Sequence, residues 1–315
     1  MTARLSPTRR TMMLGGFCLC CTPALPRAAA ADEAFATEEI AAGIHIRRGL
    51  DEDASPSNAD AIANIGFIIG RDGVLVTDAG GSLADGRRLR AAIRHKTQLP
   101  IKYVVMSHVH PDHVFGAGAF LDDHPFFVGH ARLARELAAR GDYYRKALTE
   151  LYGAESAGPV VMPKLEVQEE AKLDLGDRAI IATAHKTAHT TCDLSLFDSQ
   201  TGTLLPADLL FVKRVPSLDG SLTGWLAELA RLKQMPAARA VPGHGPVAVA
   251  WPGGAADLER YLQVLAQETR HAIDAGVGLA DATGSVAQSE RRNWLLFDAY
   301  NGRNVTEAYK ELEWQ

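Results

Sequence analysis

Short apolar runs bounded by Gly, Asp and Pro mark the first half of the chain. Three of these runs are rich in β-branched residues and predict strands at residues 64–70, 73–80 and 101–108. Between the last two runs, Ser82 is followed three residues later by Asp85, a spacing typical of a helix start. The pattern predicts a helix from there to about Lys96.

The second half of the chain shows the same mixture of short and long periods. Residues 165–185 and 193–211 read as strands joined by turns that contain Gly. Apolar positions at helical spacing predict two amphipathic helices, one capped by Ser221 and one spanning Ala256–Ala275. Asn304, with Glu307 three residues later, predicts the start of a closing helix.

Two hairpin-like segments resemble each other. Residues 67–78 and 194–208 each read as strand, turn and strand, and each ends in an aspartate. We interpret them as a possible internal duplication, in which two mixed halves pack their sheets together with helices outside. Because no linker rich in Pro or Ser interrupts residues 40–315, we expect one domain over residues 32–315.

Composition and charge restrict the classes of partner. The chain has 47% hydrophobic and 23% charged residues, which is normal for a globular protein. Residues 1–31 hold four arginines and no acidic residue, so the remainder has 29 basic residues against 38 acidic ones. An acidic chain without a run of Lys or Arg is a poor candidate for phosphate-backbone binding, and we expect no nucleic-acid partner.

The N-terminus predicts an export signal peptide over residues 1–31. A basic stretch precedes an apolar run from Met12 to Leu25, and small residues then offer a cleavage site. About 14 apolar residues are too few to span a bilayer, so no membrane attachment is expected after cleavage. The adjacent Arg9 and Arg10 resemble the twin-arginine signal, with an ordinary Sec signal as the alternative. Either route predicts a periplasmic protein.

Cysteine usage agrees with removal of that segment. Three of the four cysteines lie within the apolar run, so Cys192 alone remains in the mature chain. No intramolecular disulfide is then expected. Cys192 is interpreted as a small buried residue.

The segment MSHVHPDHVFGAG, residues 106–118, carries the strongest chemical signal. His108 ends an apolar strand, and the period of two in an extended chain points His108 and His110 to one side. Pro111 suits the first turn of a helix, which would project Asp112 and His113 from a different backbone segment. One stretch could therefore supply ligands to two metal ions.

Each of these ions would need at least one ligand from elsewhere, because a catalytic zinc usually has about three protein ligands and a water. His189, Asp208 and His244 are suitable, since each is expected at a strand end or in the loop that follows. Ordinary surface or core roles are the better interpretation for five of the six remaining histidines: His45, His95, His124, His185 and His271.

The complete set of residues resembles the metallo-β-lactamase superfamily. The resemblance rests on H-x-H-x-D-H, a later His-Thr, an aspartate after a strand and a late Gly-His. It implies an α/β fold, a four-layer αββα sandwich of two mixed sheets with outer helices. It also assigns ligands, namely His108, His110 and His189 to the first metal, Asp112, His113 and His244 to the second, and Asp208 as the bridge between them.

Details of the ligands and of other segments narrow the resemblance. An aspartate at position 208 is similar to the glyoxalase-II-like and lactonase-like branches, whereas His110 argues against the diiron flavoprotein branch. Residues 210–225, 241–246 and 302–314 resemble the quinoprotein relay system zinc metallohydrolases, which are related to hydrolases of sulfur-oxidation clusters. This resemblance implies a quinoprotein dehydrogenase or its cytochrome as a periplasmic partner.

The expected reaction is hydrolysis of an activated carbonyl in a small-molecule thioester, lactone or ester. Two zinc ions are the expected cofactors, with iron or manganese as the lesser alternatives, and a pair of metals about 3.5–4 Å apart can activate a shared water. Asp112 is the expected catalytic residue, because it could orient that water and pass its proton to the leaving group. A class B β-lactamase and a non-catalytic metal-binding accessory factor are the alternatives.

Several neighbouring residues have two open interpretations. Asp78 either holds the ligand loops or caps the turn at Gly80 and Gly81. Lys213 and Arg214 either pair with a substrate carboxylate or form a solvated charged loop. The candidates for the walls of a substrate pocket are Tyr143, Tyr144 and His130.

Overall fold

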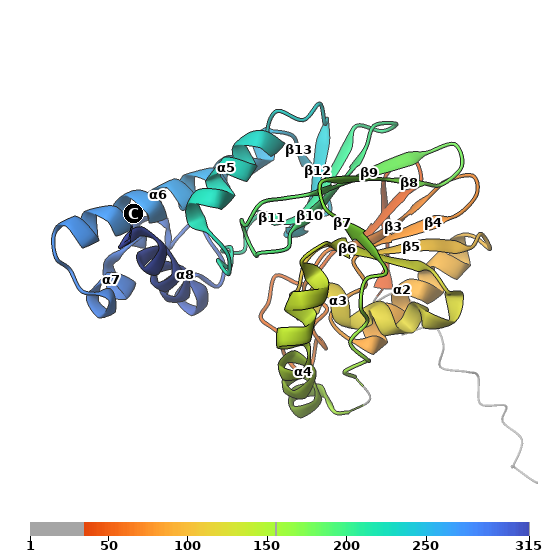
Figure 1. The fold of residues 1–315 in the computed structure, drawn as a ribbon, viewed down its shortest axis with the longest axis horizontal. Helices are drawn as coiled ribbons and strands as arrows, with labels where there is room; N and C mark the ends of the chain where they lie inside the picture. The colour runs from red at the N-terminus through yellow and green to blue at the C-terminus, as the bar shows by residue number, and fades with distance from the viewer. Residues whose placement is uncertain (1–34, 155, 315) are drawn as a thin grey trace, which may run out of the picture. The chain divides into compact units, whose positions relative to one another are not determined.

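Two β-sheets form the centre of the protein. The computed structural model describes residues 35–154 and 156–314. Figure 1 shows α2, α3 and α4 on the side of one sheet, and α5, α6, α7 and α8 on the side of the other. The predicted signal peptide, residues 1–31, lies outside the described residues.

The first sheet, within the described residues, has seven strands in chain order. They are β1 (Glu38–Ala41), β2 (Ile44–Arg47), β3 (Ile65–Ile69), β4 (Val74–Thr77), β5 (Ile101–Met106), β6 (Phe126–His130) and β7 (Leu165–Val167). Strands β1 to β4 pair antiparallel, and β4 to β7 pair parallel. The sheet is therefore mixed.

The second sheet runs in the order β13-β12-β11-β10-β9-β8 across the described residues. Its strands are β8 (Glu170–Asp174), β9 (Ala179–Ala184), β10 (Leu194–Asp198), β11 (Thr203–Phe211), β12 (Arg239–His244) and β13 (Val249–Ala250). Only β11 and β12 pair parallel here, so this described sheet is mixed as well.

Helices and short 3-10 turns cover the outer faces. The α-helices are α2 (Leu83–Lys96), α3 (Pro111–Val114), α4 (Leu133–Tyr152), α5 (Leu222–Leu232), α6 (Ala256–Asp274), α7 (Leu279–Ser285) and α8 (Phe297–Leu312). The 3-10 helices are η2 (Phe115–Asp123), η3 (Gly253–Ala255) and η4 (Gln288–Glu290). In the part of the chain that the structure describes, no helix is long and apolar enough to cross a membrane.

Alternation along the strands of the first sheet builds two apolar layers. In β4, Val74 and Val76 pack toward α2 and α4, whereas Leu75 packs into the space between the sheets. In β5, Val104 faces the helices and Val105 faces the second sheet. Both faces are buried, which explains why these strands read as continuous apolar runs. The expected four-layer sandwich of two mixed sheets with outer helices is confirmed.

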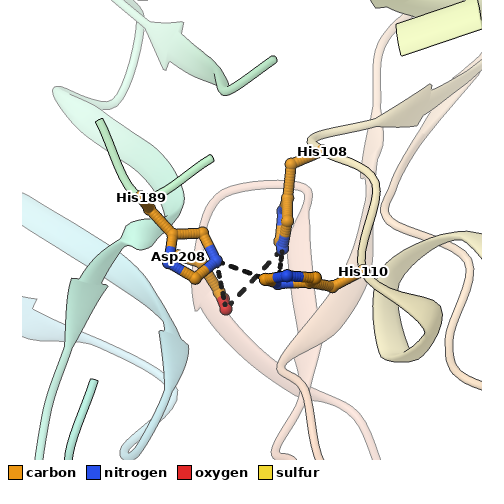
Figure 2. A group of neighbouring side chains, drawn as sticks. All are labelled: His108, His110, His189 and Asp208. Atoms are coloured by element: carbon orange, nitrogen blue, oxygen red, sulfur yellow. Dashed lines mark hydrogen bonds and ion pairs between the residues drawn. The ribbon is translucent and has the colours of Figure 1, made fainter. Parts of the chain in front are cut away.

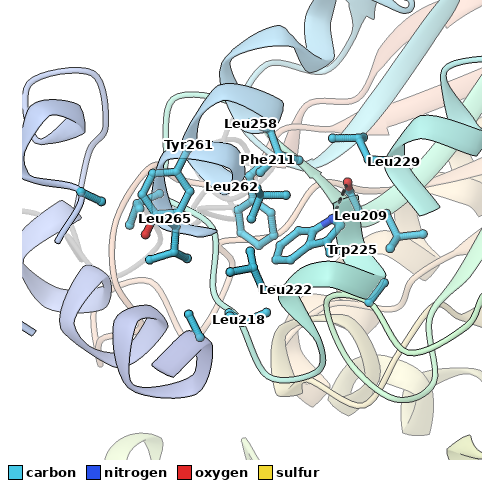
Figure 3. Close-up of a cluster of buried hydrophobic side chains, with 14 of the residues drawn as sticks. Leu209, Phe211, Leu218, Leu222, Trp225, Leu229, Leu258, Tyr261, Leu262 and Leu265 are labelled. Atoms are coloured by element: carbon cyan, nitrogen blue, oxygen red, sulfur yellow. Dashed lines mark hydrogen bonds between the residues drawn. The ribbon is translucent and has the colours of Figure 1, made fainter. Parts of the chain in front are cut away.

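A third apolar layer joins the second sheet to the C-terminal helices. Trp225 of α5 packs with Phe211 of β11, and Leu258 and Tyr261 of α6 belong to the same buried cluster (Figure 3). The indole N–H of Trp225 donates to the carbonyl oxygen of Leu209 at 3.2 Å, so its one polar group is satisfied. This layer fixes α5 and α6 against the strand that carries Asp208.

Several predicted elements are confirmed with small shifts of their bounds. Ser82 and Ser221 cap α2 and α5, and their hydroxyl oxygens accept from the backbone N–H of Asp85 and Gly224. Both predicted hairpins pair antiparallel. One assignment was wrong, because β7 opens the segment 165–185 yet pairs with β6 in the first sheet.

The closing helix begins earlier than Asn304. Helix α8 starts at Phe297, and its buried stripe continues through Asn301, Asn304 and Val305. Two of those buried positions are asparagines, so a search for apolar residues at helical spacing did not detect the first two turns of the helix. Asn304 lies inside the helix and does not cap it.

Helix α8 is fixed by polar side chains on its buried face. The Asn304 side chain accepts from the Leu218 backbone N–H at 2.9 Å and donates to the Pro216 carbonyl at 2.7 Å. The Glu311 carboxylate accepts from the backbone N–H of Leu222 at 2.6 Å, at the start of α5. Helix α8 is thereby held to the loop 216–218 and to α5.

Replacing Asn304 by Ala is expected to lower the free energy of unfolding by about 3 kcal/mol, because a buried N–H and a buried carbonyl lose their partner. Urea unfolding measures this change. The control Lys310→Ala, at an exposed position of the same helix, should cost no more than about 0.5 kcal/mol. A loss below about 1 kcal/mol for Asn304→Ala would contradict the assigned network.

Candidate metal centre

The structure brings all seven predicted ligands together at one end of the two sheets. The residues fall into two groups, His108, His110, His189 and Asp208 in one, and Asp112, His113 and His244 in the other. Within each group, one potential ligand atom per residue lies within 4.8 Å of all the others. The segment after β5 supplies four of the seven, and the second sheet and its loops supply three.

The first group converges on the Nδ1 atom of His110. The Nε2 atoms of His108 and His189 lie 3.1 and 3.0 Å from it. Asp208 completes the group, because its Oδ2 atom lies 3.4 Å from His189 Nε2 and 3.7 Å from His108 Nε2. Figure 2 shows the four side chains pointing toward one another, with His108 and His110 on one backbone segment and His189 and Asp208 on others.

The second group lies on the other side of the same Asp208 carboxylate. Oδ2 of Asp112 lies 3.2 Å from His244 Nε2 and 3.5 Å from His113 Nε2. Asp208 approaches both of these rings, with Oδ1 at 3.1 Å from His113 Nε2 and Oδ2 at 3.4 Å from His244 Nε2. One carboxylate therefore contacts both groups of ligands.

The predicted turn at Pro111 accounts for the division between the groups. His110 has an extended backbone with φ −68° and ψ 146°, and Pro111 is the first residue of α3. Pro at this position loses no hydrogen bond, since the first N–H groups of a helix have no partner within it. Asp112 and His113 are consequently presented from the first turn of α3, whereas His108 and His110 precede that helix.

Asp208 was expected at the end of a strand, and this expectation was wrong. Strand β11 continues to Phe211, and Asp208 lies inside it at a point where the register with β12 shifts. Ala207 has a left-handed backbone with φ 48°, which turns the next side chain out of the regular pleat. Gly243 on β12 leaves the space needed, because a Cβ there would lie 1.8 Å from Asp208 Oδ1.

Each histidine of the centre is oriented by an oxygen at its outer ring nitrogen. These outer contacts are His108 Nδ1 with Ser107 Oγ at 2.9 Å, His110 Nε2 with Asp219 Oδ2 at 3.2 Å, His113 Nδ1 with Asp78 Oδ2 at 2.9 Å, His189 Nδ1 with the Ser217 carbonyl at 2.6 Å, and His244 Nδ1 with the Ile62 carbonyl at 3.0 Å. When the outer nitrogen donates, the inner nitrogen of a neutral imidazole keeps its lone pair. The five inner lone pairs then face the centre of the site.

These contacts fit bound cations. The inner nitrogens of His108 and His189 each approach that of His110 to about 3 Å, and lone pairs at that separation repel unless a positive charge lies between them. His113 Nε2 and Asp208 Oδ1 are buried and have no hydrogen-bond partner in the described structure. Unpaired buried groups of this kind are costly without a ligand. Nitrogen and carboxylate donors in this number suit zinc.

A family comparison agrees with the geometry. Residues 59–244 match the family described as the metallo-beta-lactamase superfamily. The chain belongs to this superfamily. Members are generally hydrolases, so the coarse assignment as a superfamily hydrolase with a site able to hold metal is supported by both the family and the cluster of ligands.

Solved structures show the same fold at low sequence identity. A metallo-beta-lactamase from Pontibacter korlensis is 17% identical, with a TM-score of 0.60, and the similarity covers 72% of this chain and 98% of that one. A sec-alkylsulfatase, Pisa1 from Pseudomonas sp., is 16% identical with a TM-score of 0.60. That similarity covers 87% of this chain and 49% of the alkylsulfatase.

A curated relative matches over a shorter stretch. The linear primary-alkylsulfatase of Pseudomonas sp. (strain ATCC 19151) is 34% identical over 62 residues. This stretch is 20% of the present chain and 12% of that protein. The match therefore concerns only a small part of the longer relative.

Burial and charge divide the histidines of this metallo-beta-lactamase superfamily member into two kinds. Burial lowers the pKa of His189 to about 3 and also holds the pKa of His108 low, so both rings are neutral and able to act as ligands. Burial opposes charge on His113 as well, but the carboxylates of Asp208, Asp112 and Asp78 together outweigh it and raise the pKa of that ring. In the same way, burial opposes charge on Asp112, but His113 and His244 together outweigh it and hold the pKa of that carboxyl low.

Asp78 holds the ligand loops, the first of the two roles expected for it. Its Oδ2 accepts from His113 Nδ1, and its Oδ1 accepts from the Ser107 backbone N–H at 2.8 Å. One carboxylate thus fixes a ligand ring and the loop that precedes His108.

Asp219 was missed by the sequence analysis. It lies in a turn next to Gly220, where an aspartate usually serves the local backbone, so no motif marked it. In the structure its Oδ2 accepts from His110 Nε2 and from Nη1 of Arg140, which lies on α4. Burial opposes the charged form, but these two partners lower the pKa of Asp219 to about 2.

A cavity of about 450 Å³ opens beside the centre and reaches His110, Asp112, Asp208 and His244. Three of the residues proposed for substrate contact line it, namely Tyr143, Tyr144 and Arg214. His130 and Lys213 do not line it. The pocket-wall interpretation of His130 was wrong, whereas Lys213 takes the second of its two interpretations, a charged residue in a solvated loop.

The burial and contacts of these two residues explain why neither lines the cavity. His130 is buried, and its Nε2 donates to the His185 carbonyl at 3.2 Å. Lys213 has an exposed side chain, whereas the next residue, Arg214, is buried. Cys192 is a buried free thiol, and burial raises its pKa to about 12, as expected of a small packing residue.

Replacing Asp219 by Ala is expected to lower zinc affinity about 10-fold to 100-fold, because His110 loses the oxygen that orients its ring. Competition with a chromogenic chelator measures the affinity. Asp219→Asn should retain part of it, since the amide oxygen can still accept. The control Asp142→Asn changes an exposed aspartate on α4 and should leave affinity unchanged. Equal affinity in Asp219→Ala and the unmodified protein would contradict the assigned role.

Proposed function

We propose that this protein is a hydrolase that uses two zinc ions to cleave a small molecule with an activated carbonyl, such as a thioester, lactone or ester. The observation that carries this proposal is the position of Asp208, whose two oxygens lie 3.1–3.7 Å from inner nitrogens in both groups of ligands. A carboxylate with contacts on both sides is suited to bridging two cations.

The seven side chains divide naturally between two ions. His108, His110 and His189 would hold the first, and Asp112, His113 and His244 the second, with Asp208 shared. Bound zinc would supply Lewis acidity toward the carbonyl and would lower the pKa of a water. A cavity on one side leaves a place for substrate, as a catalytic site requires and a purely structural zinc site does not.

Asp112 is the proposed proton-transfer residue. It lines the cavity, and its neighbours His113 and His244 keep its carboxyl ionised. An ionised carboxylate at this place can accept a proton from the attacking water and return it to the leaving group. Phe211 and Leu148 line the same cavity and restrict the access of bulk water to the reacting groups.

Hydrolysis of a sulfate ester is a second candidate. It is favoured by the sec-alkylsulfatase similarity, which extends over 87% of this chain, whereas the similarity to the Pontibacter korlensis metallo-beta-lactamase extends over 72%. The curated primary-alkylsulfatase match points the same way. Both reactions need an activated water and a polarised electrophile, so the ligand set alone does not separate them.

Export and partner choice complete the proposal. The basic and apolar pattern of residues 1–31 supports secretion to the periplasm, with the twin-arginine route favoured by Arg9 and Arg10. The segments 210–225 and 302–314 support a place among the quinoprotein relay system zinc metallohydrolases, beside a quinoprotein dehydrogenase or its cytochrome.

A substrate panel tests the proposed reaction. Zinc-loaded protein is assayed with an acyl thioester, a lactone, a cephalosporin and a primary alkyl sulfate, and turnover of the thioester or lactone is expected. Preferential cleavage of the alkyl sulfate would replace the carbonyl reaction with the second candidate. Preferential cleavage of the cephalosporin would indicate a β-lactamase. Inactivity on all four, together with tight binding to a quinoprotein dehydrogenase, would favour a non-catalytic accessory factor.

The variant Asp112→Asn is the internal control for this panel. It should lower turnover at least about 100-fold, because an amide cannot take the proton. Circular dichroism should show an unchanged fold. Turnover close to that of the unmodified protein would remove Asp112 from the proposed role.

A further inference from the structure

Part of the cavity wall comes from outside the segment that matches the family. That match ends at residue 244, whereas helix α8 spans Phe297–Leu312. Tyr300 and Arg303 of α8 both line the cavity beside the metal ligands. The C-terminal helices therefore add side chains to the site that the superfamily assignment does not explain.

Tyr300 brings two arginines together at this wall. The guanidinium carbons of Arg214 and Arg303 lie over its ring, at 5.2 and 5.6 Å from the centroid. Each cation is attracted to the electron-rich face of the ring. Arg214 is fixed further, because its Nη2 donates to the Tyr300 hydroxyl at 3.0 Å and its Nη1 donates to the Glu52 carbonyl at 3.2 Å.

The charges of this pair are only partly balanced by protein groups. Asp53 accepts from the Tyr300 hydroxyl at 2.6 Å, and its Oδ1 lies 3.9 Å from Arg214 Nη2. Asp53 is more than half exposed, so its attraction to Arg214 is weakened by solvent. Within residues 35–154 and 156–314, Arg303 has its ring contact but makes no hydrogen bond or ion pair.

Arg303 also borders a second recess. This recess has a volume of about 380 Å³ and shares His110, Tyr144, Ser217 and Arg303 with the cavity at the metal centre. Arg303 therefore lines both the cavity at the metal centre and the second recess. A group bound there would lie beside the reacting centre and would still reach solvent.

Helix α4 adds apolar side chains to the cavity. Ala147, Leu148 and Leu151 of α4 line it, and Leu151 is 43% exposed. A cavity lined by both apolar side chains and two arginines suits a molecule with an apolar part and an acidic group.

We propose that Arg303, together with Arg214 and the Tyr300 ring, binds an anionic group of the substrate away from the bond that is cleaved. The inference rests on the proposed function, because it takes the metal centre as the place of reaction. The substrate class is then an amphiphilic anion, whose acidic group is a carboxylate, sulfonate or sulfate. Guanidinium groups bind such oxyanions through charge-assisted hydrogen bonds.

Calorimetric titration of the zinc-loaded protein tests this inference without requiring turnover. The probe is 1-octanesulfonate, because a sulfonate is a poor zinc ligand and leaves the arginines as its main partners. The neutral comparison is 1-octanol, which has the same apolar chain. We expect the protein to bind the sulfonate more tightly than the alcohol.

Arg303→Gln should weaken sulfonate binding about tenfold and leave binding of the alcohol unchanged, since one exposed charged partner is lost. The matched control is Arg292→Gln, which removes the same charge. Arg292 is exposed and lines neither cavity. It should bind the sulfonate as the unmodified protein does. Tyr300→Leu removes the ring that holds both arginines and should weaken sulfonate binding by a similar factor.

Equal sulfonate affinity in Arg303→Gln and Arg292→Gln would overturn the inference and leave Arg303 with a structural contact to Tyr300 only. Equal weakening of sulfonate and alcohol binding would overturn it as well, because the loss would then not depend on charge. Hydrolytic inactivity combined with the expected charge-dependent binding would contradict the proposed reaction and support the anion site. The two failures are therefore distinguishable.

Discussion

Five imidazoles and two carboxylates lie together in one site, and the rest of the structure has to offset the repulsion between their lone pairs. Inner nitrogens about 3 Å apart repel one another unless cations lie between them. Each outer nitrogen needs an oxygen, and these oxygens come from elements as distant in sequence as Ile62 and Asp219. The ligand rings can hold their positions only if both sheets and the intervening loops are fixed.

The apolar layers provide that fixation. Residues from both sheets, such as Leu75 of β4 and Val241 of β12, pack between the sheets and hold the two sources of ligands together. Close backbone approach adds precision on the second sheet, where Gly243 leaves room for Asp208 beside it. On the outer side, Asn304 and Glu311 hold α8 to the loop that carries Ser217 and to α5. Helix α8, which supplies Tyr300, therefore also fixes the loop whose Ser217 carbonyl orients His189.

The sequence predicted those parts that depend on local spacing. His108, His110 and His113 lie within six residues, and Pro111 indicates that a helix starts between His110 and His113. The division of these histidines between two metal ions therefore follows from local backbone geometry. Ser82 and Ser221 were recognised as caps because a cap acts within its own helix. The layer order was implied by the resemblance to the metallo-β-lactamase superfamily, and the two similar hairpin-like segments agreed with it.

The parts that depend on distant contacts could not be predicted in this way. Asp208 lies inside a strand because β11 changes register against β12, which no local pattern encodes. Asp219 and Arg214 are ordinary polar residues in the sequence, and only the fold brings them to His110 and Tyr300. His130 was misassigned because proximity in sequence to the motif does not place it in the cavity.

Metal stoichiometry tests the central claim most directly. Elemental analysis of purified, zinc-loaded protein should give about two zinc ions per chain, as expected of a two-metal hydrolase. Asp208→Ala should reduce the content to one ion or fewer, because it removes the only carboxylate in the described structure that contacts both groups of ligands. Two tightly bound zinc ions in Asp208→Ala, or no bound metal in the unmodified protein, would contradict the account.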